Sequence, residues 1–169
     1  MLDCVRKKIR EYLENSNINK NNIKIQIAYS GGLDSSCLLD TLLTLQTELN
    51  ISIFLSYVNY NTSLYSGEVL KHIKTLPEIV NKNIKTVSIS SDENFESKAR
   101  DIRYRFFNEI SKKNKIDLTF TAHHKKDQLE TLVMQFINAS DFISMIGVRG
   151  EIGSIKRPLL SCEKSTIFK

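Results

Sequence analysis

The repeated alternation of strand-like and helix-like segments constrains the fold of this sequence more than any other feature. Ile23, Ile25 and Ile27 alternate with other residue types, which predicts a strand, and the leucine-rich stretch from about Ser35 to Leu49 predicts a helix after it. Further strands are predicted over Ile51–Val58, Ile84–Ile89 and Asp117–Ala122. Further helices are predicted around Val5 to Leu13 and over Glu68–Asn81, which Pro77 is expected to kink or shorten, Glu96–Asn114 and Asp127 to about Ile137. Strands separated by helices of this length indicate parallel βαβ units, so we expect a doubly wound α/β fold, a mainly parallel sheet with helices on both faces.

Composition limits the classes of protein to which the chain can belong. Its 169 residues suit one domain, and 41% hydrophobic with 25% charged residues is ordinary for a globular fold. No apolar stretch approaches the roughly 18 to 20 residues that span a bilayer, and no secretory signal is expected. Cys4, Cys37 and Cys162 are far apart in sequence and form no CxxC pair. We therefore expect three reduced thiols in a cytoplasmic protein.

Three of the four predicted strands run directly into a polar cluster at their carboxyl end. The clusters are residues 30–35 (SGGLDS), 59–63 (NYNTS) and 123–128 (HHKKDQ). Ligands of open parallel sheets bind beyond the carboxyl ends of the strands. The sequence therefore predicts one shared binding site at that edge of the sheet.

The first cluster has the composition of a phosphate-binding loop. Adjacent glycines permit positive φ and close approach of a ligand to the backbone, and the N-terminus of the following helix favours an anion. The loop lacks the lysine of a Walker A sequence and the GxGxxG of a dinucleotide fold. Asp34 suits an anion site if Mg²⁺ bridges the two, and the alternative is a tight turn with Asp34 as a helix cap. The candidate nucleotide-binding residues are Ser30, Gly31, Gly32, Leu33, Asp34 and Ser35.

Four motifs together resemble a known family. The SGGLDS loop resembles the SGGxDS signature of PP-loop ATP pyrophosphatases, which cleave ATP between the α and β phosphates. Residues 96–104 (ESKARDIRY) resemble the ExxARxxRY of tRNA(Ile)-lysidine synthetases. Residues 123–131 (HHKKDQLET) and 157–160 (RPLL) resemble two later motifs of the same family, and all four occur in the family order.

The resemblance implies a two-step ligase reaction. ATP activates C2 of the wobble cytidine of a CAU-anticodon tRNA(Ile), which releases pyrophosphate and leaves an adenylated intermediate. The ε-amine of free L-lysine then attacks C2, AMP leaves, and lysidine is formed. The implied cofactors are ATP and Mg²⁺, and the implied partners are the tRNA and lysine, with a homodimer as a further option and no membrane.

The resemblance also assigns roles to individual residues. It implies catalytic roles for Asp34, Asp127, Glu130 and Arg100, a metal role for Asp34, and substrate contacts from Asp127, Glu130, His124 and Arg103. Asp127 and Glu130 are three apart, so they share a helix face on which they could hold an ammonium or accept its proton. The alternatives are a helix cap for these carboxylates and a solvated basic face for Arg103. Either His123 or His124 could line the nucleotide site.

The chain departs from the family pattern at several places. Residues 57–60 read YVNY where the family usually has HVNH, which removes two imidazoles. Lys126 stands where an aspartate is common, which weakens a metal role there. We expect residues 1–160 to form the catalytic domain and residues 161–169 to begin a helix that leads to a missing C-terminal region.

Three alternatives to lysidine synthesis remain at the level of sequence. A tRNA thiolase is disfavoured because no catalytic cysteine pair is present, and a small-molecule amidotransferase subunit is disfavoured by the arginine-rich 96–104 motif. The third alternative is a non-catalytic nucleotide-binding fragment. The net charge of +5 favours an anionic partner. The segment from Arg100 to Lys126 contains eight basic and three acidic residues, and this excess of positive charge favours contact with tRNA phosphates.

Overall fold

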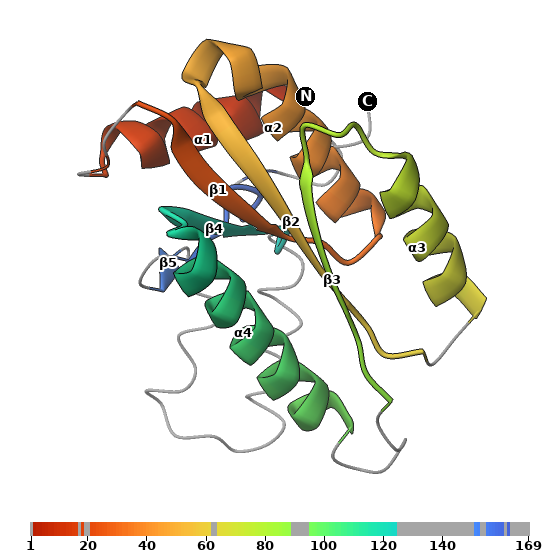
Figure 1. Cartoon of the computed structure of the whole chain (residues 1–169). Helices are drawn as coiled ribbons and strands as arrows, with labels where there is room; N and C mark the ends of the chain where they lie inside the picture. The colour runs from red at the N-terminus through yellow and green to blue at the C-terminus, as the bar shows by residue number, and fades with distance from the viewer. Residues whose placement is uncertain are drawn as a thin grey trace.

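A computed structural model of the chain describes residues 2–16, 18, 21–61, 64–88, 95–124, 151–152, 155–160 and 162 (Figure 1). Its elements are α1 (Leu2–Glu14), β1 (Ile23–Ala28), α2 (Leu33–Leu49), β2 (Ile51–Asn59), α3 (Leu64–Thr75), β3 (Asn81–Thr86), α4 (Phe95–Asn114), β4 (Leu118–Thr121), β5 (Glu151–Ile152) and β6 (Ile155–Lys156). Within the described residues these strands form one sheet in the order β3-β2-β1-β4-β6-β5. All pairs are parallel except β5 with β6.

Helices cover both faces of this sheet, which confirms the predicted doubly wound fold (Figure 1). The isoleucines of β1 point to the face on which α1, α2 and α3 pack, and they share one buried cluster with Ile9, Leu42 and Ile73. On the opposite face, Phe106 and Phe107 of α4 pack against Val58 of β2. The apolar faces that the sequence periods predict for the strands and for the helices therefore pack against each other as expected.

A buried polar network crosses the three central strands. The Gln26 side-chain amide donates to Ser56 Oγ at 2.8 Å, and Thr119 Oγ1 donates to the Gln26 amide oxygen at 3.0 Å. Gln26 and Ser56 are fully buried, and Thr119 is nearly so. The hydrogen bonds offset the desolvation of these groups, which would otherwise cost about 1–3 kcal/mol for each unpaired group.

The predicted helix over Glu68–Asn81 begins too late in the sequence, although Pro77 shortens the helix as expected, and the predicted strand over Ile84–Ile89 is misplaced. Helix α3 begins at Leu64 and ends at Thr75, because Pro77 cannot continue a helix and disfavours helical backbone in the residue before it. A turn follows, with the Val80 N–H donating to the Pro77 carbonyl at 3.1 Å. Strand β3 then begins at Asn81, three residues earlier than predicted.

Polar side chains explain why β3 was hard to find in the sequence. It is an edge strand that pairs with β2, and all six of its residues are exposed or half-buried. The amides of Asn81 and Asn83 each donate to a carbonyl of β2, both at 3.3 Å. Because side chains supply part of the pairing, this strand lacks the apolar alternation by which strands are recognised.

The expectation of three reduced thiols is wrong for two of them. Cys4 on α1 and Cys162 form a disulfide, whereas Cys37 is free. The residues are separated by 158 positions, so their proximity follows from the sheet topology and not from any local pattern. The described residues contain no helix that is long and apolar enough to cross a membrane. The helix predicted from Asp127 lies outside the described residues.

Candidate active site

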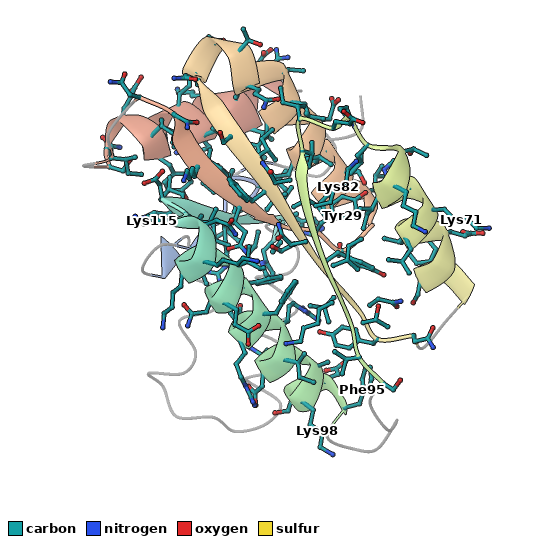
Figure 2. The ribbon with its side chains drawn as sticks, viewed as in Figure 1. Tyr29, Lys71, Lys82, Phe95, Lys98 and Lys115 are labelled. Carbon is teal, nitrogen blue, oxygen red and sulfur yellow. A yellow bond between two sulfur atoms is a disulfide. The ribbon has the colours of Figure 1, made fainter. Side chains whose placement is uncertain are left out.

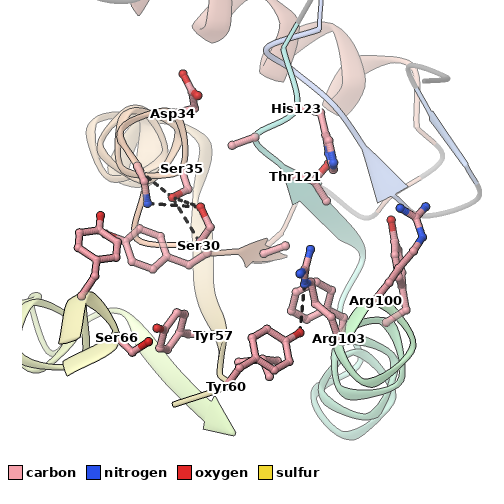
Figure 3. A pocket seen from close by; sticks show the side chains of 18 residues that line it. Ser30, Asp34, Ser35, Tyr57, Tyr60, Ser66, Arg100, Arg103, Thr121 and His123 are labelled. Carbon is pink, nitrogen blue, oxygen red and sulfur yellow. Dashed lines mark hydrogen bonds between the residues drawn. The ribbon is translucent and has the colours of Figure 1, made fainter. Parts of the chain in front are cut away.

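A cavity of about 490 Å³ lies at the carboxyl ends of β1, β2 and β4 (Figure 3). Five segments line it: the β1–α2 loop, the end of β2, the start of α3, one face of α4, and the residues that follow β4. The parallel arrangement of these strands places their ends on one side of the sheet. Described members of the three polar clusters therefore meet in one cavity.

The β1–α2 loop requires glycine at position 31. Its φ is +81°, a conformation that residues with a Cβ rarely adopt. A Cβ at this position would also lie inside the van der Waals contact of the Val69 side chain on α3. The Tyr65 hydroxyl donates to the Gly31 carbonyl at 2.8 Å, so α3 holds the loop from outside.

Two serines close the loop onto the start of α2. Ser30 Oγ donates to Ser35 Oγ at 3.1 Å, and Ser35 Oγ donates to the Gly32 carbonyl at 2.8 Å. Ser30 Oγ also accepts a hydrogen bond from the Gly32 N–H at 3.3 Å. The capping residue of α2 is Gly32, and it has no side chain with which to accept the first-turn N–H groups. These N–H groups are suited to an anionic ligand.

Asp34 lies in the first turn of α2, so it is not the helix cap that the alternative interpretation proposed. One carboxylate oxygen of Asp34 lies 3.5 Å from Nε2 of His124. The His124 side chain is 5% exposed, whereas that of Asp34 is 26% exposed and lines the cavity. Mg²⁺ is commonly held by one or two carboxylates together with phosphate oxygens and water, and Asp34 beside the glycine loop fits that donor set.

His123, and not His124, is the histidine that lines the cavity. Its Nδ1 lies 2.9 Å from Oγ1 of Thr121, which fixes the orientation of the ring (Figure 3). His124 is buried, and its Nε2 lies 3.5 Å from the Asp34 carboxylate. The substrate contact predicted for His124 stays a prediction. The sequence alone did not separate these two adjacent residues, because the exit of the chain from β4 decides which one faces the cavity.

Two arginines of α4 lie on the cavity wall opposite the glycine loop (Figure 3). The guanidinium of Arg100 lies over the Tyr104 ring at 5.1 Å, and that of Arg103 lies over the Tyr60 ring at 5.9 Å. Arginine stacked on an aromatic ring keeps its N–H donors available for phosphate. The cavity therefore has one wall of backbone N–H groups and one of guanidinium groups, and both favour an anion.

Tyrosines supply much of the remaining surface, and the sequence analysis assigned them no role. Tyr29, Tyr57 and Tyr65 line the cavity together with Tyr60 and Tyr104. Burial raises the pKa of Tyr29 and of Tyr57 above the ordinary value, so both side chains remain neutral at physiological pH. Their position next to the polar clusters at the strand ends was the available signal in the sequence. Asp127 and Glu130 lie outside the described residues.

A glycine loop at the carboxyl edge of a doubly wound sheet, faced by arginines across a cavity, defines a nucleotide-binding α/β domain. The model of the PP-loop domain family matches residues 1–169. The chain belongs to the PP-loop domain family.

Curated relatives confirm the predicted family resemblance. The chain is 33% identical to a tRNA(Ile)-lysidine synthase of Thermosipho africanus over 174 residues, which cover 99% of the chain and 40% of that protein. It is 32% identical to the tRNA(Ile)-lysidine synthase of Streptococcus gordonii over 152 residues, or 86% of the chain and 36% of that protein. A third such synthase, from Clostridium perfringens, is 27% identical over 96% of the chain and 37% of its own length. The chain thus spans about two fifths of these relatives.

Solved structures show the same fold at lower sequence identity. A U34-tRNA thiolase from Methanococcus maripaludis, solved with its [4Fe-4S] cluster, aligns with a TM-score of 0.75 and 20% identity over 96% of this chain and 60% of its own. An NH3-dependent NAD synthetase from Campylobacter jejuni aligns with a TM-score of 0.56 and 18% identity over 98% of this chain and 68% of its own. At these identities the likeness concerns the fold alone.

Proposed function

We propose that this chain is the ATP-using domain of a ligase that joins lysine to C2 of the wobble cytidine in CAU-anticodon tRNA(Ile), with release of AMP and pyrophosphate. The observation that carries the proposal is the cavity in which the 30–35 loop faces Arg100 and Arg103. The names of the curated relatives support lysine and tRNA(Ile) as the substrates. We expect the reaction to take place in the cytoplasm.

The glycine loop is proposed to bind the β and γ phosphates of ATP. The backbone N–H groups at the start of α2 would donate to phosphate oxygens, while Ser30 and Ser35 keep the loop closed. Mg²⁺ held by Asp34 would offset the charge that develops on the leaving pyrophosphate. His124 lies beside Asp34 and would keep its carboxylate oriented toward the cavity.

Arg100 is proposed to stabilise the negative charge at the α phosphate as the nucleotide base is adenylated. Its guanidinium lines the cavity and stacks on Tyr104, which leaves N–H groups for phosphate oxygens. Arg103, one helical turn further along α4, is proposed to contact substrate phosphate. The base that reacts must enter the same cavity, since the carbonyl oxygen on C2 has to reach the α phosphate, from which pyrophosphate leaves.

Asp127 and Glu130 are proposed to act in the lysine step. Their negative charge would hold the lysine and accept the proton that the amine loses when it attacks C2. A carboxylate repels phosphate, so these residues would serve lysine more than ATP. The proposal rests on their place in the HHKKDQLET motif.

The experiment that tests the function is a reconstitution with purified protein. The chain is incubated with ATP, Mg²⁺, L-lysine and a CAU-anticodon tRNA(Ile) transcript, and the tRNA is digested to nucleosides for mass spectrometry. We expect lysidine and one equivalent of pyrophosphate, neither product when ATP is omitted, and no lysidine when lysine is omitted. Pyrophosphate release that requires ammonia or a sulfur donor instead of lysine would contradict the proposal and favour an NAD synthetase-like or thiolase-like reaction.

A further inference from the structure

Tyr60 joins the end of β2 to the beginning of α4. Its hydroxyl donates to the Ala99 carbonyl at 2.7 Å and lies 3.4 Å from Nε of Arg103, which donates to it. The Tyr60 ring meets Phe95, the first residue of α4, edge to face at 6.0 Å. The guanidinium of Arg103 lies over the same ring at 5.9 Å. One side chain thus contacts the first three turns of α4.

The other packing of α4 on the sheet centres on residues further along the helix, with Ile102 at the edge of that cluster. Phe106, Phe107 and Ile110 form a buried cluster with Val58, and Lys85 of β3 pairs with Glu109 at 3.6 Å. These contacts fix the second half of α4 against the sheet. The first half, which begins at Phe95 (Figure 2), carries Arg100 and Arg103 on the cavity wall (Figure 3). A small rotation of this half about the fixed half would move both guanidinium groups relative to the glycine loop.

We propose that Tyr60 is a positioning residue that sets the distance of Arg103 and, through Ala99, of Arg100 from the phosphate-binding loop. The hydroxyl accepts from Arg103 and donates to the helix backbone, and both bonds require a group that is donor and acceptor at one atom. This role rests on the proposed function, in which Arg100 and Arg103 contact phosphate groups. This role accounts for the tyrosine at position 60, where the related family pattern usually has histidine.

The chemistry of the hydroxyl predicts how two substitutions differ. In Tyr60→Phe the ring still packs on Phe95 and still carries Arg103, but both hydrogen bonds are lost. In Tyr60→His a neutral imidazole nitrogen can either donate or accept at one atom, but cannot do both. Protonation of that imidazole, with an ordinary pKa of about 6.5, would add a positive charge beside Arg103 and repel it.

The first experiment measures positioning without reference to activity. Hydrogen–deuterium exchange is followed in peptides from residues 95–104 and 105–114 of the wild type, Tyr60→Phe and Tyr12→Phe. Tyr12 packs against Phe120 in the other core cluster, so it controls for the loss of any tyrosine hydroxyl. We expect Tyr60→Phe to exchange about three- to tenfold faster in residues 95–104, because the hydrogen bonds of the hydroxyl to this segment are lost, with residues 105–114 unchanged. Unchanged exchange in residues 95–104 would refute the proposal.

The second experiment separates positioning from the proposed function itself. In the reconstituted reaction, Tyr60→Phe is expected to lower kcat for pyrophosphate release about three- to tenfold with KM for ATP within about twofold, while Tyr12→Phe matches the wild type. Tyr60→His should show an additional loss of kcat below about pH 6.5 that the wild type and Tyr60→Phe lack. A wild-type kcat in Tyr60→Phe, or the same pH profile in all three, would overturn the positioning role. A wild type that releases no pyrophosphate would overturn the proposed function, while the exchange experiment would still decide the role of Tyr60.

Discussion

Gly31 is the most constrained position of the proposed phosphate-binding loop, and its replacement by alanine tests whether the shape of the loop determines stability and ATP binding. An alanine would have to adopt φ near +81°, and its Cβ would meet the two methyl groups of Val69. Left-handed backbone costs an L-residue about 1–2 kcal/mol. Overpacking against a buried side chain costs typically 1–3 kcal/mol. Gly31→Ala should therefore lower the free energy of unfolding by roughly 2–5 kcal/mol.

A second substitution separates the two causes of this cost. Val69→Ala removes both methyl groups that the new Cβ would meet, and by itself costs about 1–3 kcal/mol because Val69 is buried. In the double variant the overpacking is relieved but the backbone strain is not. The double variant should consequently be more stable than the sum of the single effects predicts, by about 1–3 kcal/mol.

Urea unfolding of the four proteins, together with the dissociation constant for ATP–Mg²⁺, measures both quantities. Gly67→Ala is the matched control, because Gly67 is exposed on α3 and a Cβ there would meet no atom within 4 Å. That control should be neutral or more stable by up to about 1 kcal/mol, since alanine favours helix. Gly31→Ala should weaken ATP binding about tenfold or more, because about 1.4 kcal/mol of loop strain corresponds to one decade. Strictly additive stability changes, or ATP affinity unaffected by Gly31→Ala, would refute the reasoning.

The remaining predictions concern charge. Asp34→Asn should abolish pyrophosphate release while far-UV circular dichroism and melting temperature stay near wild type, and unchanged ATP turnover would remove Asp34 from the metal site. Asp127→Asn should lose lysidine formation, measured by nucleoside mass spectrometry, yet keep its affinity for ATP; equal loss of both would show that the roles of the residues are not separate. Binding of the chain to tRNA should fall steeply between about 50 and 200 mM salt, and elongator methionine tRNA should compete well in filter binding, because the arginines and lysines of α4 neutralise phosphates without reading sequence. Tight, salt-resistant preference for tRNA(Ile) would contradict that last prediction.

Local sequence patterns were sufficient to predict the elements in which apolar and polar side chains follow the pattern of burial. The alternation in β1 and the leucines of α2 predicted both elements, and the intervening SGGLDS placed the loop at the sheet edge. β3 was misplaced because an edge strand paired through asparagine side chains has no apolar period. The start of α3 was missed because its first turn follows a polar cluster that resembles a loop.

The residues of the candidate site could be predicted from the sequence only where the residue type itself indicates a chemical role. Gly32, Asp34 and the pair Arg100 and Arg103 are recognisable by type, and the structure places them around one cavity. The part played by Tyr60 depends on a distance between β2 and α4, and the choice between His123 and His124 depends on how the chain leaves β4. The Cys4–Cys162 pair depends on the whole topology. None of these has a signature at fixed spacing.

The buried network of Gln26, Ser56 and Thr119 has a consequence for the alignment of the strands. β1 and β2 both carry isoleucine at alternate positions, so sliding one past the other by two residues would still match their apolar faces. The amide of Gln26 would then be displaced from Ser56, at a cost of about 1–3 kcal/mol for a group left unpaired. The network therefore helps to fix the register of the three strands, because their hydrophobic pattern alone is compatible with more than one register. Because the glycine loop, Tyr60 and His123 all follow the ends of those strands, a polar contact in the middle of the sheet determines that they arrive at the same level.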